Sequence, residues 1–343
     1  MENSPKNSAP LVELRLAVLK TLKYFDLQDH PLTLIEISKY LFKINNFQAP
    51  DPFETPPLSN SPQSPQPSAS LKEISDALDE MPEVETENGF YFLKGRRQIA
   101  AERLHNNYGA AKRFKRSRRF LPLARHIPFV SAAALSGSEA MGNSAEGSDI
   151  DLLILTKPGR IWLARLFAAG YFQMLGMRRH GKKIADRFCL NHYVSENKYL
   201  DSDRNLYTAI EYVSLIPFFG GREVLEFQKK NLPWISKYLR QPPLALYDTP
   251  SPSVLKKFLE FILGGFVGGA LEWLARAFQI RKIKLQPGII VSPSELSFHP
   301  ESKGQRILSR FAAPALDSHV LNSHASDSHP SDGRGSRENA RGR

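Results

Sequence analysis

The sequence lacks features that would place it in an oxidising compartment or in a membrane. A single cysteine, Cys189, excludes an intramolecular disulfide framework, and in its apolar surroundings it is expected to be a buried small side chain rather than a nucleophile. The first ten residues, MENSPKNSAP, show no signal-peptide pattern. In the apolar stretch 254–278 the longest uncharged run, Phe261 to Leu271, is shorter than the span of about twenty residues that a membrane helix needs. We expect a cytoplasmic protein with no membrane partner, in which 161–177 and 254–278 are buried helices.

Acidic charge is also in short supply. Against 46 Lys and Arg there are 35 Asp and Glu, which gives a net charge of +11 and a pI near 9.6. Such a surplus suits a polyanionic ligand or partner. The chain of 343 residues, 41% hydrophobic and 24% charged, has the composition of a globular protein and the length for two ordinary domains.

The most informative segment present is 135–155, LSGSEAMGNSAEGSDIDLLIL. Asp149 and Asp151 stand one residue apart at the start of an apolar run, after a ten-residue gap that follows Gly137-Ser138. Side chains at i and i+2 project from the same face of a β-strand, so the two carboxylates would lie side by side. Paired hard oxygen ligands suit Mg²⁺ that also contacts substrate phosphates, and a glycine turn lets backbone N–H groups approach a phosphate closely.

This pattern resembles the signature of the DNA polymerase β-like nucleotidyltransferase superfamily, in which an apolar residue, Gly and Gly or Ser precede Asp-apolar-Asp/Glu-apolar. The resemblance implies that Ser136, Gly137 and Ser138 bind the phosphates of a nucleoside triphosphate (NTP). It also implies that Asp149 and Asp151 are catalytic and ligate Mg²⁺ (or Mn²⁺). More broadly, the chain resembles bacterial nucleotidyltransferase-domain proteins with an N-terminal winged helix.

Polymerase-type members of the superfamily carry a third carboxylate on a neighbouring strand. The corresponding strand here is 188–196, FCLNHYVSE, and the resemblance places Asn191 at that position. An amide is not a base and is a weaker Mg²⁺ ligand than a carboxylate, so the flanking acids Asp186 and Glu196 are alternatives. Basic residues near the strand ends are candidates for contacting the triphosphate, with nothing to rank them: Lys157, Arg160, Lys182, Lys183 and Arg187.

Residues 11–96 predict a winged-helix-like domain. Its three helices include two that begin at the capping boxes Thr33–Glu36 and Ser70–Glu73, and a hairpin turns at Asn88-Gly89. A Pro/Ser-rich segment, 46–69, is expected to be a flexible insertion. The third helix, LKEISDALDEM, carries four acids against one lysine, so DNA binding by the winged helix is not expected.

The rest of the chain predicts a linking helix, a catalytic core and a helical region. Residues 97–126 form the linking helix, whose segment KRFKRSRR at 112–119 is basic at six of eight positions and is either a solvated face or a phosphate-contacting patch. Residues 127–200 predict the nucleotidyltransferase core, and 201–312 a C-terminal helical region. Residues 317–343, rich in Ser, His, Gly and Arg, predict a disordered tail.

The expected fold class is therefore α+β, a mixed nucleotidyltransferase sheet with helices between a winged helix and a helical region. Within the helical region, 203–240 predicts two helices broken at Pro217, 253–285 predicts one long helix, and the segment PGIIVSPSELSFHP predicts a strand.

Three functions remain open. The leading one is Mg²⁺-dependent transfer of a nucleoside monophosphate from an NTP to an unidentified hydroxyl acceptor, which is a small molecule, a protein or RNA. The second is a weak or inactive nucleotide-binding regulator, motivated by Asn191. The third is a nucleic-acid-binding module that uses the winged helix and the basic linker, motivated by the net charge of +11.

Overall fold

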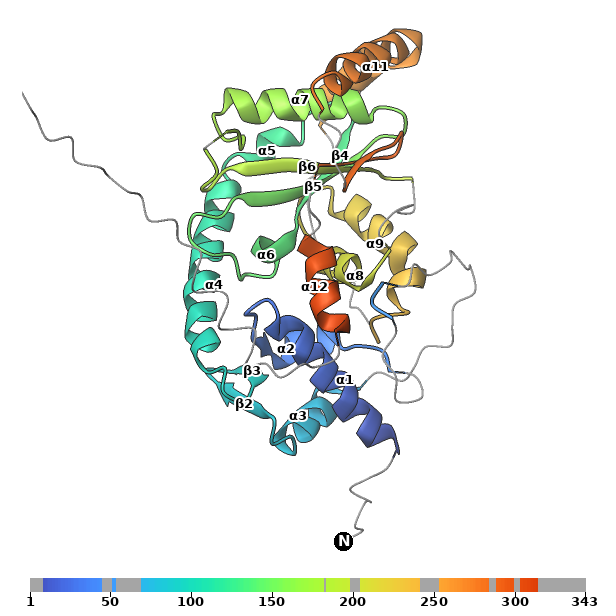
Figure 1. Ribbon diagram of the computed structural model, residues 1–343. Helices are drawn as coiled ribbons and strands as arrows, with labels where there is room; N and C mark the ends of the chain where they lie inside the picture. The colour runs from blue at the N-terminus through green and yellow to red at the C-terminus, as the bar shows by residue number, and fades with distance from the viewer. Residues whose placement is uncertain are drawn as a thin grey trace, which may run out of the picture. The chain divides into compact units, whose positions relative to one another are not determined.

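The computed structural model describes eight ranges of the chain: residues 9–44, 51–53, 69–181, 183–197, 204–240, 253–283, 288–298 and 303–313 (Figure 1). Nearly all of the expected insertion at 46–69 and the whole of the expected tail at 317–343 lie outside the described residues.

The N-terminal part combines three helices with a small antiparallel sheet. Its elements are α1 (Ala9–Asp26), β1 (Leu32–Thr33), α2 (Leu34–Tyr40), α3 (Leu71–Asp79), β2 (Val84–Glu87) and β3 (Phe90–Leu93), and the sheet order is β1-β3-β2. Both expected capping boxes form, at Thr33 and at Ser70. Asn88 and Gly89 have positive φ angles of 53° and 79°, as the tight turn between β2 and β3 requires.

A six-stranded mixed sheet organises the rest of the chain. In spatial order it contains β7 (Ile216–Phe219), β4 (Val130–Leu135), β5 (Ile150–Thr156), β6 (Phe188–Ser195), β9 (Glu295–Phe298) and β8 (Ile289–Val291). Only β5 and β6 run parallel; the other neighbours are antiparallel. The strands expected within 127–135, 149–156 and 188–196 are confirmed, and they are β4, β5 and β6.

The helical region expected at 201–312 contains more strand than we expected, and the strand expected in PGIIVSPSELSFHP is confirmed as the pair β8 and β9. The helices α8 (Leu206–Ser214) and α9 (Gly221–Ile235) flank β7, which pairs with β4, and both β8 and β9 extend the sheet beyond β6. We expected Pro217 only to break two helices. It is tolerated within β7 because this strand lies at the edge of the sheet, where one side of the backbone needs no ladder partner.

Helices cover both faces of this sheet. On one side lie α5 (Leu121–Ala124), α7 (Ile161–Met174) and α11 (Gly265–Ile280); on the other lie α6 (Gly137–Ala140), α8, α9 and α12 (Lys303–Ala312) (Figure 1). Strand β5 alternates between the two cores: Ile150, Leu152 and Ile154 face the α7 side, whereas Leu153 and Leu155 join the core that includes α1 to α3. Helix α4 (Gln98–Ser117) links the small sheet to the large one.

The long helix expected at 253–285 is two helices, α10 (Val254–Ile262) and α11, bent by 86°. The expectation that this stretch is buried is also wrong, because Phe261 and Phe266 beside the bend are 85% and 92% exposed. The other apolar stretch forms α7, which buries Ile161 to Ala164 as expected. Among the described helices none is long and apolar enough to cross a bilayer alone, and only the α10–α11 pair passes such a test when its two helices are taken together.

Candidate functional site

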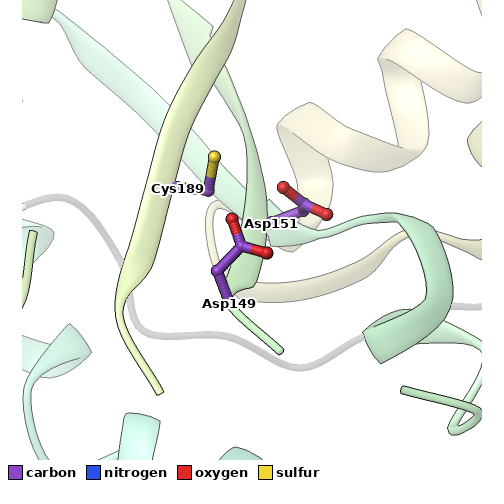
Figure 2. Close-up of side chains that lie close together, drawn as sticks. All are labelled: Asp149, Asp151 and Cys189. Carbon is purple, nitrogen blue, oxygen red and sulfur yellow. The ribbon is translucent and has the colours of Figure 1, made fainter. Parts of the chain in front are cut away.

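The structure brings Asp149 and Asp151 together at the start of β5. Asp149 directly precedes the strand, Asp151 is its second residue, and both lie on the face that continues with Leu153. One oxygen from each carboxylate and the Sγ of Cys189 on β6 lie within 4.8 Å of one another. Figure 2 shows these three side chains close together, Cys189 from β6 and the two aspartates from the start of β5.

The Ser136–Ser138 turn lies against the same pair. Gly137 has a φ of +61°, a conformation that favours glycine, and a Cβ added there would stand 3.4 Å from Oδ2 of Asp151. The backbone N–H of Ser136 donates to the carbonyl oxygen of Asp151 at 3.1 Å. The phosphate-binding turn and the metal-ligating acids that the resemblance implied are therefore neighbours in space.

The electrostatics of the pair favour a bound cation. Burial, and then the adjacent Asp149 carboxylate, raise the pKa of Asp151 to about 7. One cation is already close: Nη1 of Arg179 donates to Oδ2 of Asp149 at 2.6 Å. Two hard oxygen donors under mutual repulsion fit a divalent ion such as Mg²⁺, which would relieve that repulsion.

The residue opposite Asp151 on β6 is Cys189, and not Asn191. Asp151 pairs with Cys189 and Leu153 pairs with His192, so Asn191 is in register with neither acid. An irregularity between these two pairs gives β6 one extra residue. Burial raises the pKa of the Cys189 thiol, so this group is neutral near pH 7 and a poor ligand for a hard cation. Asn191 does line the cleft in front of the pair.

The two alternative acids are engaged elsewhere. Asp186 pairs with Arg116 at 3.4 Å, and Glu196 pairs with Lys157 at 2.8 Å. Glu196 follows the far end of β6, about 20 Å along the strand from Cys189. Neither is in place to be the third acid of this site.

A cleft of about 260 Å³ opens in front of the pair and brings in residues that sequence reasoning missed. Glu211 on α8 lines it, and its charge contributes to the raised pKa of Asp151. Burial raises the pKa of Glu211 itself, and the carboxyl shares a hydrogen bond with the side chain of Tyr207. The other side chains with a charge or ring nitrogen that line the cleft are Arg179, His192, Glu295 and Lys303.

No motif marks these added residues. Glu211 lies in an ordinary helical pattern, and Arg179 was not among the five basic residues singled out from the sequence. Of those five, Lys157 is paired with Glu196, and Lys182 lies outside the described residues.

Helix α4 braces the motif through one buried ion pair. Nε of Arg113 contacts Oε2 of Glu139 on α6 at 3.1 Å, and Nη2 donates to the carbonyl oxygen of Ser144 at 2.9 Å. The side chains of Arg113 and Glu139 are only 8% and 2% exposed. Within the basic segment 112–119, Arg113 is therefore neither a solvated charge nor open to a phosphate, and it holds the turn that follows Gly137.

Comparisons of this chain with protein-family models, with curated proteins and with solved structures each found no match.

Proposed function

We propose that this protein is a Mg²⁺-dependent nucleotidyltransferase that moves a nucleoside monophosphate from an NTP to a hydroxyl group. The observation that carries the proposal is that the Asp149–Asp151 pair lies directly against the Gly137 turn. A Cβ added at Gly137 would stand 3.4 Å from Oδ2 of Asp151. In this proposal the six-stranded sheet is the nucleotidyltransferase core, and α1 to α3 with their small sheet are a winged helix.

Different residues of the cleft would bind the metal, bind the phosphates and take the proton. Asp149 and Asp151 would hold the divalent ion, which supplies positive charge against the α-phosphate and the departing pyrophosphate. The backbone at Ser136–Ser138 would hold the phosphates. The acceptor oxygen forms a bond to the α-phosphorus, the bond to the pyrophosphate oxygen breaks, and Glu211 takes the proton of the acceptor hydroxyl.

A nucleotide-binding regulator without turnover is the second candidate. The observation that favours it is that β6 offers no carboxylate to the pair: Cys189 is in register with Asp151, and Asn191 stands where the resemblance implies a third acid. In this alternative the pair and the turn still bind the NTP and the metal, but nothing replaces the missing ligand. The two candidates therefore differ in Glu211, which takes a proton in the transferase and has no catalytic role in the regulator.

The deciding experiment measures pyrophosphate release and transfer of α-labelled ATP, GTP, CTP and UTP with Mg²⁺ or Mn²⁺. Each NTP is offered with an RNA fraction, a protein fraction and a small-molecule fraction as acceptors. We expect labelled product from one fraction, and its loss on Asp149→Asn/Asp151→Asn. Glu211→Gln should reduce turnover while NTP binding is kept.

Asp186→Asn is the matched control, since it makes the same chemical change at an acid that is already paired with Arg116. NTP binding that depends on Asp149 and Asp151 with no product from any fraction would favour the regulator. Binding or turnover that survives the double substitution would refute both candidates.

A further inference from the structure

The α10–α11 pair exposes many large apolar side chains. Phe258 and Phe261 on α10 are 59% and 85% exposed, and Phe266, Trp273 and Phe278 on α11 are 92%, 66% and 53% exposed. These five aromatic residues define what we call the aromatic face. So many exposed large apolar groups on one pair of helices indicate an interaction site.

The acids of both helices and Gln279 of α11 bind the body of the protein. Glu260 accepts from the backbone N–H of Phe129 at 2.7 Å, and Glu272 accepts from the N–H groups of Trp162 and Leu163 at the start of α7, at 2.8 and 2.9 Å. Gln279 donates to the carbonyl oxygen of Trp162 at 2.9 Å. The helices are thus held with both carboxylates and this amide against the body and with large apolar side chains outward, unlike a helix whose apolar face is buried.

All charges exposed on this pair are basic. Residues 253–283 are fully described, and their only acids, Glu260 and Glu272, are the two that face inward. The exposed charges are Lys257, Arg276, Arg281 and Lys282. Nζ of Lys282 lies 4.1 Å from the ring centroid of Phe278, so cations border the aromatic face directly.

This charge pattern argues against a second copy as the occupant. Two copies meeting through the aromatic face would bring together surfaces whose exposed charges are all positive, with no exposed acid on either helix to pair with them.

The lengths of the two helices argue against a transmembrane segment, because α10 has 9 residues, α11 has 16, and an 86° bend separates them. Phe261 and Phe266, the most exposed of the five, lie on either side of the 86° bend, which we call the corner of the pair.

We propose that the aromatic face binds the surface of an anionic lipid bilayer, with the corner of the α10–α11 pair inserted among the headgroups and the four basic residues on the lipid charges. Apolar and aromatic residues beside Lys and Arg are the chemistry of a helix that lies in the interface. This inference goes beyond the proposed function and does not depend on it, because neither nucleotide nor metal takes part. It differs from the expectation, drawn from the sequence, of no membrane partner.

The test is flotation of the full chain with vesicles of phosphatidylcholine alone or with about one third phosphatidylserine, whose anionic headgroups attract basic residues. We expect binding to the anionic vesicles that weakens as salt is raised.

Phe261→Ser/Phe266→Ser should weaken binding to these vesicles about tenfold or more. Arg276→Gln/Arg281→Gln/Lys282→Gln should weaken it about fivefold for each cation removed. The matched control is Ile35→Ser/Tyr108→Ser, which removes two apolar residues that are 70% and 76% exposed elsewhere, and it should bind like the parent.

Trp273 gives a second readout, since the other two tryptophans, Trp162 and Trp234, are buried at 3% and 0% exposure. Its emission should move to shorter wavelength with anionic vesicles, and Trp273→Phe should abolish the shift while flotation persists. Equal flotation of the parent and Phe261→Ser/Phe266→Ser would overturn the proposal. So would a dimer in sedimentation that this substitution dissociates, or a Trp273 emission that is already short without vesicles and unchanged by them.

Discussion

Replacing Asp151 by Asn should stabilise the metal-free protein at alkaline pH. Burial and Asp149 raise the pKa of this carboxyl from 3.8 to about 7. The folded protein therefore holds a proton that the unfolded chain has released, so the free energy of unfolding falls as pH rises from about 4 to about 7. Above that range the folded state carries the full cost of a partly buried, repelled charge.

The magnitude follows from the size of the shift. Each pKa unit corresponds to about 1.4 kcal/mol, which sets a ceiling of about 4 kcal/mol for the cost of the Asp151 charge at pH 8. Because the side chain keeps some contact with water, we expect Asp151→Asn to raise the free energy of unfolding by about 2 to 4 kcal/mol at pH 8. The gain should shrink by about half or more at pH 5, where the parent protein is itself protonated at this position.

Urea unfolding at pH 8 and pH 5, with EDTA present, measures this difference. Asp186→Asn is the control and should change the free energy of unfolding by less than about 0.5 kcal/mol at either pH, since it removes an exposed pair. An Asp151→Asn protein that is less stable than the parent at pH 8, or a gain that is the same at both pH values, would refute the reasoning about the acid pair.

Three further substitutions test how the site is built. Arg113→Met should lower the free energy of unfolding by about 3 to 5 kcal/mol, because it leaves Glu139 as a buried charge without its ion-pair partner. A loss below about 1 kcal/mol in urea unfolding would show that this ion pair does not stabilise the turn. Gly220→Ala should lower the temperature of thermal unfolding, because φ at Gly220 is +69° and the new Cβ would stand 2.4 Å from the carbonyl oxygen of Ser131. An unchanged unfolding temperature would contradict the β4–β7 geometry. Cys189→Ser should leave Mg²⁺-dependent NTP binding in calorimetry within about threefold, since a neutral thiol contributes little to a hard cation; a tenfold loss would show that the thiol is a ligand.

The local parts of the fold could be predicted from the sequence. The capping boxes at Thr33 and Ser70, the Asn88-Gly89 turn and the strands β4 to β6 all depend on residues close together in the chain. The side-by-side placement of Asp149 and Asp151 follows from the two-residue period of a strand in the same way.

What failed depends on contacts between distant segments. A four-residue strand containing Pro217 is recognisable only once β4 offers it an edge. The register that sets Cys189 opposite Asp151, and the extra residue of β6 that follows this pair, depend on how β5 and β6 meet, which no local pattern reveals. Glu211 reaches the cleft because α8 packs beside α6, and neither helix carries a sequence signal for that contact.

The orientation of α10 and α11 shows a further limit. Apolar residues at helical spacing indicate that one face avoids water, but they do not say whether that face meets the protein core. Here Glu260 and Glu272 bind backbone N–H groups of the body, and these hydrogen bonds turn the aromatic face outward. The composition of 254–278 alone could not distinguish this arrangement from a buried helix.

The most direct test of the central claim is a crystal structure with Mn²⁺ and a non-hydrolysable NTP, in which anomalous scattering locates the metal. We predict a Mn²⁺ peak within about 2.5 Å of carboxylate oxygens of both Asp149 and Asp151, with the triphosphate against the Ser136–Ser138 turn. A triphosphate bound elsewhere, or a metal that contacts neither aspartate, would contradict it.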